Sequence, residues 1–132
     1  RPEIWGRLAT LGEVCEDSLL NLLCGRNELA RESIRREMEA KRRELEGGAP
    51  SPIERLLAEQ IVLCWLHLRH VEQAQAKNEE GRTVAQLDDF ERWVARAERR
   101  YLRALSALAR VRRLLRPSVQ LNIADQQVNV AR

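Results

Sequence analysis

Residues 51–71, SPIERLLAEQIVLCWLHLRHV, decide the fold of this 132-residue chain. Residues 61–66 form an unbroken apolar run, and apolar side chains would occur on nearly every side of a helix formed by this stretch. A helix that is apolar around its circumference lies in the interior, with neighbours on more than one side. We therefore expect residues 53–77 to form the central helix of a protein that is all-α over its first 116 residues.

Three residues mark the beginning of this central helix. Ser51 is a suitable N-cap, Pro52 suits the first turn, and Glu54 completes a capping box. Gly47, Gly48 and the two residues that follow interrupt the chain just before it. The sequence therefore predicts a loop at residues 47–50.

Two further helices are predicted on the N-terminal side. The first begins at about residue 3 or 7 and ends at Cys24, before Gly25, and the second is capped by Asn27 and ends at about Glu46. The second helix has few apolar residues and pairs acidic with basic side chains four residues apart, so we expect it on the outside. These pairs are Glu32 with Arg36, Glu37 with Lys41, and Glu39 with Arg43.

The first two helices and their short turn also have the outline of a helix-turn-helix motif. A recognition helix presents exposed polar and basic side chains to bases, whereas the second helix alternates Glu with Arg. This alternative therefore receives little support from the residues.

The fourth predicted helix begins at a second capping box, Thr83 with Gln86, and ends before Pro117. It would be nearly 50 Å long at about 1.5 Å per residue. We expect it to form a long antiparallel hairpin with the central helix, turned at residues 78–82, with the first two helices packed across the base. Its apolar seam, spaced as in a coiled coil, is Leu87, Phe90, Val94, Ala97, Tyr101, Ala104, Leu108, Val111 and Leu115.

Residues 117–132 form a different kind of segment, which contains the related phrases QLNIA at 120–124 and QVNVA at 127–131. Alternating apolar and amide residues are typical of a half-buried strand. A strand here needs partners, and copies of the tail from other subunits would supply them; a disordered C-terminus is the alternative. We expect a helical bundle domain at 1–116 and an oligomerisation tail at 117–132 that uses Val119, Leu121, Ile123, Val128 and Val130.

The basic residues are concentrated near the C-terminal end. Residues 1–50 hold 9 basic and 10 acidic side chains, residues 51–95 hold 5 and 8, and residues 96–132 hold 9 and 2. Five arginines of the fourth helix would form a stripe opposite its apolar seam, with three more beside it and no acidic partners within the chain. The candidate nucleic-acid-binding residues are Arg96, Arg99, Arg100, Arg103, Arg110, Arg112, Arg113 and Arg116.

Three interpretations of this stripe stay open at this point. It is an ordinary solvated helix face with cations near a helix C-terminus, a surface that binds the phosphate backbone of DNA or RNA, or a surface that meets acidic side chains of a protein. Acidic residues around Glu79 and Asp88 of a neighbouring subunit are a candidate for the last.

The sequence contains no pattern that indicates catalysis, a metal or a cofactor. Successive three-residue steps drift around a helix, so Cys64 and His70 point well apart on either side of His67, and no Glu-x-x-His, GxSxG or HExxH motif occurs. We expect Cys15, Cys24 and Cys64 to be buried thiols of a reducing compartment. We therefore expect no enzyme activity, no cofactor and no metal ion.

The chain also has no predicted membrane segment. Its longest apolar run is far shorter than the roughly 20 residues that cross a bilayer, and no signal-like segment precedes the first helix. We expect a soluble cytoplasmic protein without a membrane partner.

The stretches SPIERLLAEQIVLCWLHLRH and RRYLRALSALARVRRLL, together with the Gln-x-Asn phrases of the tail, resemble small uncharacterised helical proteins of bacteria and phages. This resemblance implies no activity and no site residue. A helical body with an oligomerising β tail is also similar in outline to phage small terminase subunits, without sharing a motif.

Together these patterns predict a non-catalytic homo-oligomeric adaptor that binds nucleic acid with weak sequence specificity, of the kind found in phages or mobile elements. The alternative is a protein-only scaffold or regulatory subunit whose helical hairpin docks on a larger partner protein.

Overall fold

The central element of the structure is helix α4 (Pro52–Lys77), against which all the other described helices pack. The structure, a computed structural model, describes residues 11–78 and 80–115. These residues form α2 (Leu11–Cys24), α3 (Glu28–Glu46), α4 and α5 (Val84–Leu114), and none of them lies in a strand. The all-α class is confirmed. The beginning of the first predicted helix, Arg116 and the whole tail from 117 to 132 lie outside the described residues.

Capping side chains set the helix boundaries as the sequence predicts. Ser51 and Glu54 form a complete capping box at α4, with the Ser51 amide donating to the Glu54 carboxylate at 2.7 Å. Thr83 and Gln86 form the same arrangement at α5. The side chain of Asn27 accepts a hydrogen bond from the third residue of the α3 segment at 3.0 Å. These bonds satisfy amide groups that have no partner within the helix.

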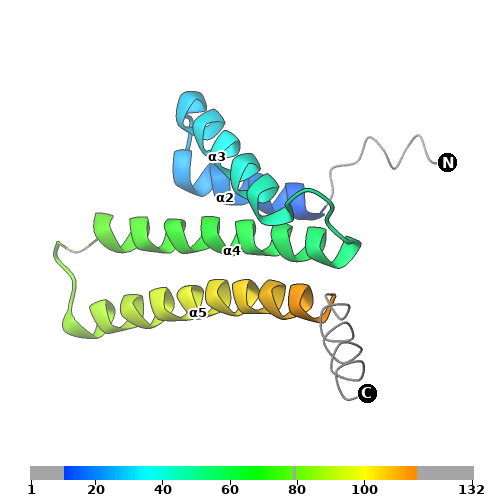
Figure 1. Cartoon of the computed structure of the whole chain (residues 1–132). Coiled ribbons are helices and arrows are strands. Elements are labelled where there is room, and N and C mark those ends of the chain that lie inside the picture. The colour runs from blue at the N-terminus through cyan, green and yellow to red at the C-terminus, as the bar shows by residue number, and fades with distance from the viewer. Residues whose placement is uncertain (1–10, 79, 116–132) are drawn as a thin grey trace, which may run out of the picture.

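Helix α4 lies as a middle layer between α2 and α3 on one side and α5 on the other (Figure 1). The first core cluster joins α2, α3 and α4 and consists of Leu20, Met38, Val62, Trp65 and Leu66. The second cluster joins α4 to α5 and consists of Leu68, Val71 and Ala97. The two clusters lie on different sides of α4, which explains why its middle is apolar around most of its circumference.

Helix α5 runs beside α4 in the opposite direction, and α4 is the described helix on which its backbone packs (Figure 1). Only Ala97 and Leu108 of its 31 residues are fully buried. The other residues of the predicted seam are half-buried, except for Leu115, which is exposed just beyond the helix. Most of the circumference of α5 therefore faces outward.

The prediction of three buried thiols is wrong in part. Cys64 is buried and Cys24 is half-buried, but Cys15 is exposed. Helix α2 buries only Leu20 completely, and a side chain five residues away points about 140° from it around the helix. The side of α2 that carries Cys15 therefore does not reach the core.

Within the described ranges, no helix combines the length and the apolar character that a membrane span requires.

Leu66 and Leu56 provide a test of the central position of α4. Leu66 is 1% exposed in the first core cluster, whereas Leu56 is 67% exposed on the same helix. We expect Leu66→Ala to lower the free energy of unfolding by about 2–5 kcal/mol and Leu56→Ala to change it by no more than about 0.5 kcal/mol, measured by urea denaturation. Equal effects of the two substitutions would contradict the assigned packing.

Candidate nucleic-acid interface

The candidate interface is the outward side of α5. The helix turns Ala97 and Leu108 toward α4, and at 100° per residue the arginine positions fall on the opposite side. All five residues of the predicted stripe are exposed, namely Arg96, Arg99, Arg103, Arg110 and Arg113. We call these five residues the arginine row.

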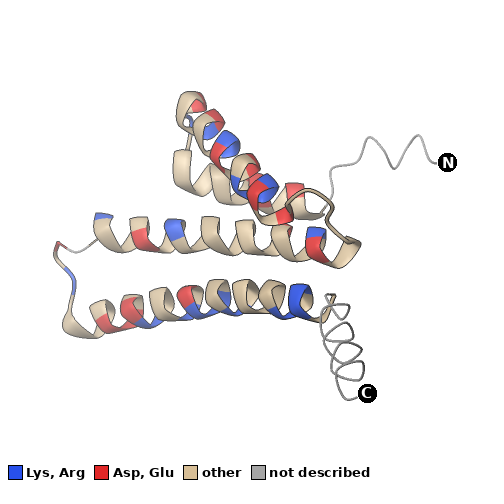
Figure 2. Cartoon of the chain, in the orientation of Figure 1, with Lys and Arg blue, Asp and Glu red and all other residues tan. Residues whose placement is uncertain are grey.

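The arginine row has no counter-charges of its own. Within the ranges 11–78 and 80–115, none of its five residues forms an ion pair. Acidic segments of α5 lie in the half nearer the α4–α5 connection, and basic segments follow one another through the other half (Figure 2). The guanidinium groups are therefore free to meet an anion from outside the chain.

Helix α3 has the opposite arrangement, although it is also rich in arginine. Arg36 binds Glu32 at 2.9 Å and Arg43 binds Glu39 at 3.1 Å within the helix. Arg35 reaches Asp17 of α2 at 2.7 Å. Red and blue segments alternate along α3 (Figure 2), so its charges neutralise one another locally. This difference favours α5 over α3 as an anion-binding surface.

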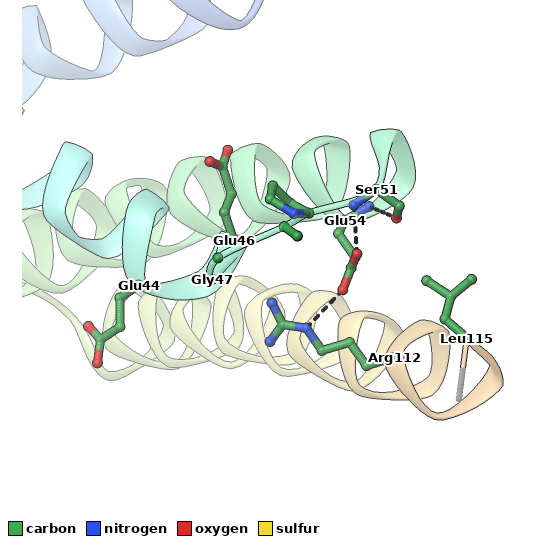
Figure 3. A pocket seen from close by; sticks show the side chains of 10 residues that line it. Glu44, Glu46, Gly47, Ser51, Glu54, Arg112 and Leu115 are labelled. Carbon is green, nitrogen blue, oxygen red and sulfur yellow. Dashed lines mark hydrogen bonds and ion pairs between the residues drawn. The ribbon is translucent and has the colours of Figure 1, made fainter. Parts of the chain in front are cut away.

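Arg112 does not belong with the arginine row, and the expectation that it lacks a partner within the chain is wrong. Its Nε donates to Glu54 at 3.1 Å, and its Nη2 donates to the carbonyl oxygen of Leu45. Figure 3 shows the guanidinium group of Arg112 pointing from α5 to the carboxylate of Glu54, which the capping box also holds. Arg112 thus joins the end of α5 to the start of α4 and the end of α3.

A signal for this role exists in the sequence. Arg112 follows Leu108 by four residues and precedes Leu115 by three, so it lies in the phase of the apolar seam rather than of the arginine row. A charged residue at such a position is turned toward the neighbouring helix, where it needs a partner.

The hydrogen bonds around Glu54 change its acidity. The amide and the hydroxyl of Ser51 bind the carboxylate, and Arg112 adds a further hydrogen bond and its positive charge, so the pKa of Glu54 lies below its ordinary value of 4.5. The adjacent hollow of about 560 Å³ is lined by Glu44, Glu46 and Glu54 as well as by Arg112 (Figure 3). With three carboxylates and one engaged arginine, it does not suit an anion.

Arg100 lies beside the arginine row, on the side of α5 nearer α2 and α4. It lines a groove of about 400 Å³ together with Gln60, Cys64, His67 and residues of α2. The pKa of His67 is lowered by its burial, and then by the positive charges of Arg100 and of His70. His67 therefore tends to remain neutral, and Arg100 is the cation of this groove.

One residue of the surface was missed at the sequence level. Arg92 is exposed on α5 and precedes Arg96 by four residues, which continues the three- and four-residue spacing of the arginine row toward the α4–α5 connection. The signal was present in this spacing, but Asp88, Asp89 and Glu91 lie close by in the sequence and obscured it.

Aromatic rings gather next to this end of the arginine row. Phe90 and Trp93 have ring centroids 5.8 Å apart, and His67 and His70 of α4 meet Trp93 edge-on at 6.4 and 6.2 Å. We call His67, His70, Phe90 and Trp93 the aromatic cluster. It contains the only phenylalanine and both histidines of the chain. The two histidines, which belong to α4, pack against Trp93 of α5.

No candidate metal site occurs in the part of the chain that the structure describes, where His, Cys, Asp and Glu side chains nowhere gather in groups of three with metal-binding geometry.

Comparisons of the chain with family models, with curated proteins and with solved structures found no match.

Arg112 and its neighbour Arg113 allow the structural role of Arg112 to be tested. We expect Arg112→Gln to destabilise the fold at neutral pH by on the order of 1 kcal/mol and the matched Arg113→Gln to have little effect, because Arg113 is exposed and has no ion pair to a described residue. Unfolding in urea measures both.

The pH dependence of the Arg112→Gln effect follows from Glu54. The pKa of Glu54 is lower in the folded than in the unfolded chain, so its contribution is complete above about pH 4.5 and is lost as the pH falls through the folded-state value. The destabilisation by Arg112→Gln should therefore shrink below pH 4.5, with a remainder from the bond to Leu45. A pH-independent difference would show that the Glu54 contact contributes nothing.

Proposed function

We propose that the protein is a non-catalytic, self-associating adaptor that binds the phosphate backbone of DNA or RNA through the arginine row of α5. The observation that supports this proposal most is a row of five exposed arginines without counter-charges on the described chain. The guanidinium group binds phosphate oxygens through two parallel hydrogen bonds. Because such contacts do not read base edges, the binding is weakly specific for sequence.

The shape of α5 supports this proposal. Its outward side is a continuous helical surface, and the axial distance from Arg96 to Arg113 is about 25 Å at 1.5 Å per residue. Several successive phosphates lie within such a length, so the contacts act together. The two long helices α4 and α5 hold the row straight, and the Arg112 contact anchors the end of α5 to α4.

Self-association belongs to the proposal for two reasons. The sequence pattern of residues 117–132 predicts two strands that would need partner strands, and α5 leaves apolar side chains uncovered at Val84, Leu102 and Leu114. Several copies of the arginine row in one assembly would bind a polyanion more tightly than one copy.

A second candidate function is that of a protein-only scaffold or regulatory subunit. The same exposed apolar residues of α5 favour it, since Leu102 is 52% exposed in a helix that packs mainly on α4. In that case the arginines meet acidic side chains of a partner protein. Co-purification with one protein that persists after nuclease treatment would support this second candidate.

Charge reversal tests the nucleic-acid proposal directly. We expect Arg99→Glu, Arg103→Glu and Arg110→Glu together to abolish retention of DNA or RNA in a low-salt gel shift, because they replace cations of the arginine row with anions. The matched control reverses Arg26, Arg36 and Arg43 of the α2–α3 region, which changes the net charge equally. Wild-type binding should also fall steeply with salt, since each phosphate contact releases counter-ions.

Both triple variants should keep the helical circular dichroism of the wild type. A wild-type chain that retains no nucleic acid at low salt contradicts the proposal, and so does an equal loss of binding in the two triple variants.

Truncation tests the assembly. We expect a chain that stops at Arg116 to keep its helical signal, because the core clusters lie upstream, and to form a smaller species in light scattering. Leu121→Asp with Val128→Asp should have the same effect by placing charges where strands from several subunits meet. An oligomer of unchanged size after both changes would remove the tail from the proposed assembly.

A further inference from the structure

Trp93, a member of the aromatic cluster, lies beside a hollow of the surface. It is 38% exposed and, with Phe90, it forms the wall of a hollow of about 720 Å³. Polar side chains complete the hollow, namely Arg82, Gln86 and Asp89. A concave site with ring surfaces and a few polar groups is typical of the recognition of a flat, polar-edged molecule.

The rings of Phe90 and Trp93, which line the hollow, have different contacts within the protein. The guanidinium group of Arg82 lies over the ring of Phe90, with its carbon 3.9 Å from the ring centroid, so this face is already covered. Trp93 contacts Phe90, His67 and His70 in tilted or edge-on geometry. These contacts hold the indole in place. The entropic cost of ordering this side chain when a base stacks on it is therefore lower.

The polar groups of the hollow match the edge of a nucleobase. The carboxylate of Asp89 accepts hydrogen bonds from amino groups, and the amide of Gln86 both donates and accepts. Any base offers a flat face to the indole, so stacking on Trp93 needs no particular sequence.

The hollow adjoins the basic surface of α5. Arg92 precedes Trp93 directly, and Arg96 and Arg100 follow it by three and seven residues, which is about 5 and 10 Å along the helix axis. A strand whose phosphates follow the arginine row therefore has a base within reach of Trp93. In a duplex the bases are stacked and paired inside, so only an unpaired base has a free face for the indole.

We infer that the ligand of the arginine row is single-stranded nucleic acid, and that one of its bases stacks on Trp93 between Gln86 and Asp89. This inference rests on the proposed function, because the phosphate contacts of the arginine row bring the strand to the hollow. Phosphate contacts supply the salt-dependent part of the affinity, and the stacked base supplies a part that needs no charge.

The test uses the full chain and two fluorescently labelled single strands of equal length and charge, each of about 16 nucleotides, the upper end of known site sizes. One strand carries all its bases, and the other is abasic over its central part. Anisotropy at low salt measures both affinities for the wild type, for Trp93→Ala and for Trp93→Phe. Leu29→Ala is the matched control, because it removes exposed apolar surface from α3, away from α5.

We expect Trp93→Ala to weaken binding of the base-bearing strand about five- to hundredfold, the range for loss of one stacked base, and to leave binding of the abasic strand unchanged. Trp93→Phe should restore much of the affinity because it keeps a ring, whereas Leu29→Ala should have no effect on either strand. Circular dichroism of each variant checks that the helices are intact.

The inference is overturned if the wild type binds both strands equally, or if Trp93→Ala weakens binding of both strands to the same extent. In either case, the proposed binding of phosphates by the arginine row is unaffected. Failure of either strand to bind the wild type at low salt overturns the proposed function and the inference together.

Discussion

Burial of α4 on two sides is the constraint on which the rest of the structure depends. Val62 and Leu66 belong to the cluster shared with α2 and α3, and Leu68 and Val71 belong to the cluster shared with α5. Each neighbouring helix needs only one apolar side to cover α4. The outer sides of these helices can therefore carry charged residues. The arrangement of these charges differs between α3 and α5.

Rotation about the axis of α5 separates the arginine that contacts α4 from the exposed arginines. Arg112 and Arg113 are adjacent in the sequence, but consecutive residues differ by about 100° in direction. Arg112 points toward the start of α4 and binds Glu54, whereas Arg113 is exposed. A count of positive residues does not distinguish these two arginines. Their angular positions relative to Leu108 do, because they turn Arg112 toward α4 and leave Arg113 exposed.

Charge and stacking have complementary roles on the proposed surface. In the proposed function, the arginine row would attract a polyanion over a distance and without regard to sequence. The aromatic cluster at one end of the row would act only in contact, and it would distinguish a strand with accessible bases from a duplex. Helix α3 differs from α5, because its Arg35, Arg36 and Arg43 form ion pairs with Asp17, Glu32 and Glu39. Of these two arginine-rich helices, α5 therefore offers the exposed row of arginines without ion pairs to described residues.

The sequence by itself determined the local structure of the described chain. Capping boxes at Ser51 and Thr83 and the apolar run of α4 give the all-α class and the helix boundaries, because capping and periodicity depend on residues only a few positions apart. The tertiary structure decided that Arg112 is an anchor, that Cys15 is exposed, and that both histidines meet Trp93. These outcomes depend on the rotation and register of helices far apart in the chain, which local patterns do not specify.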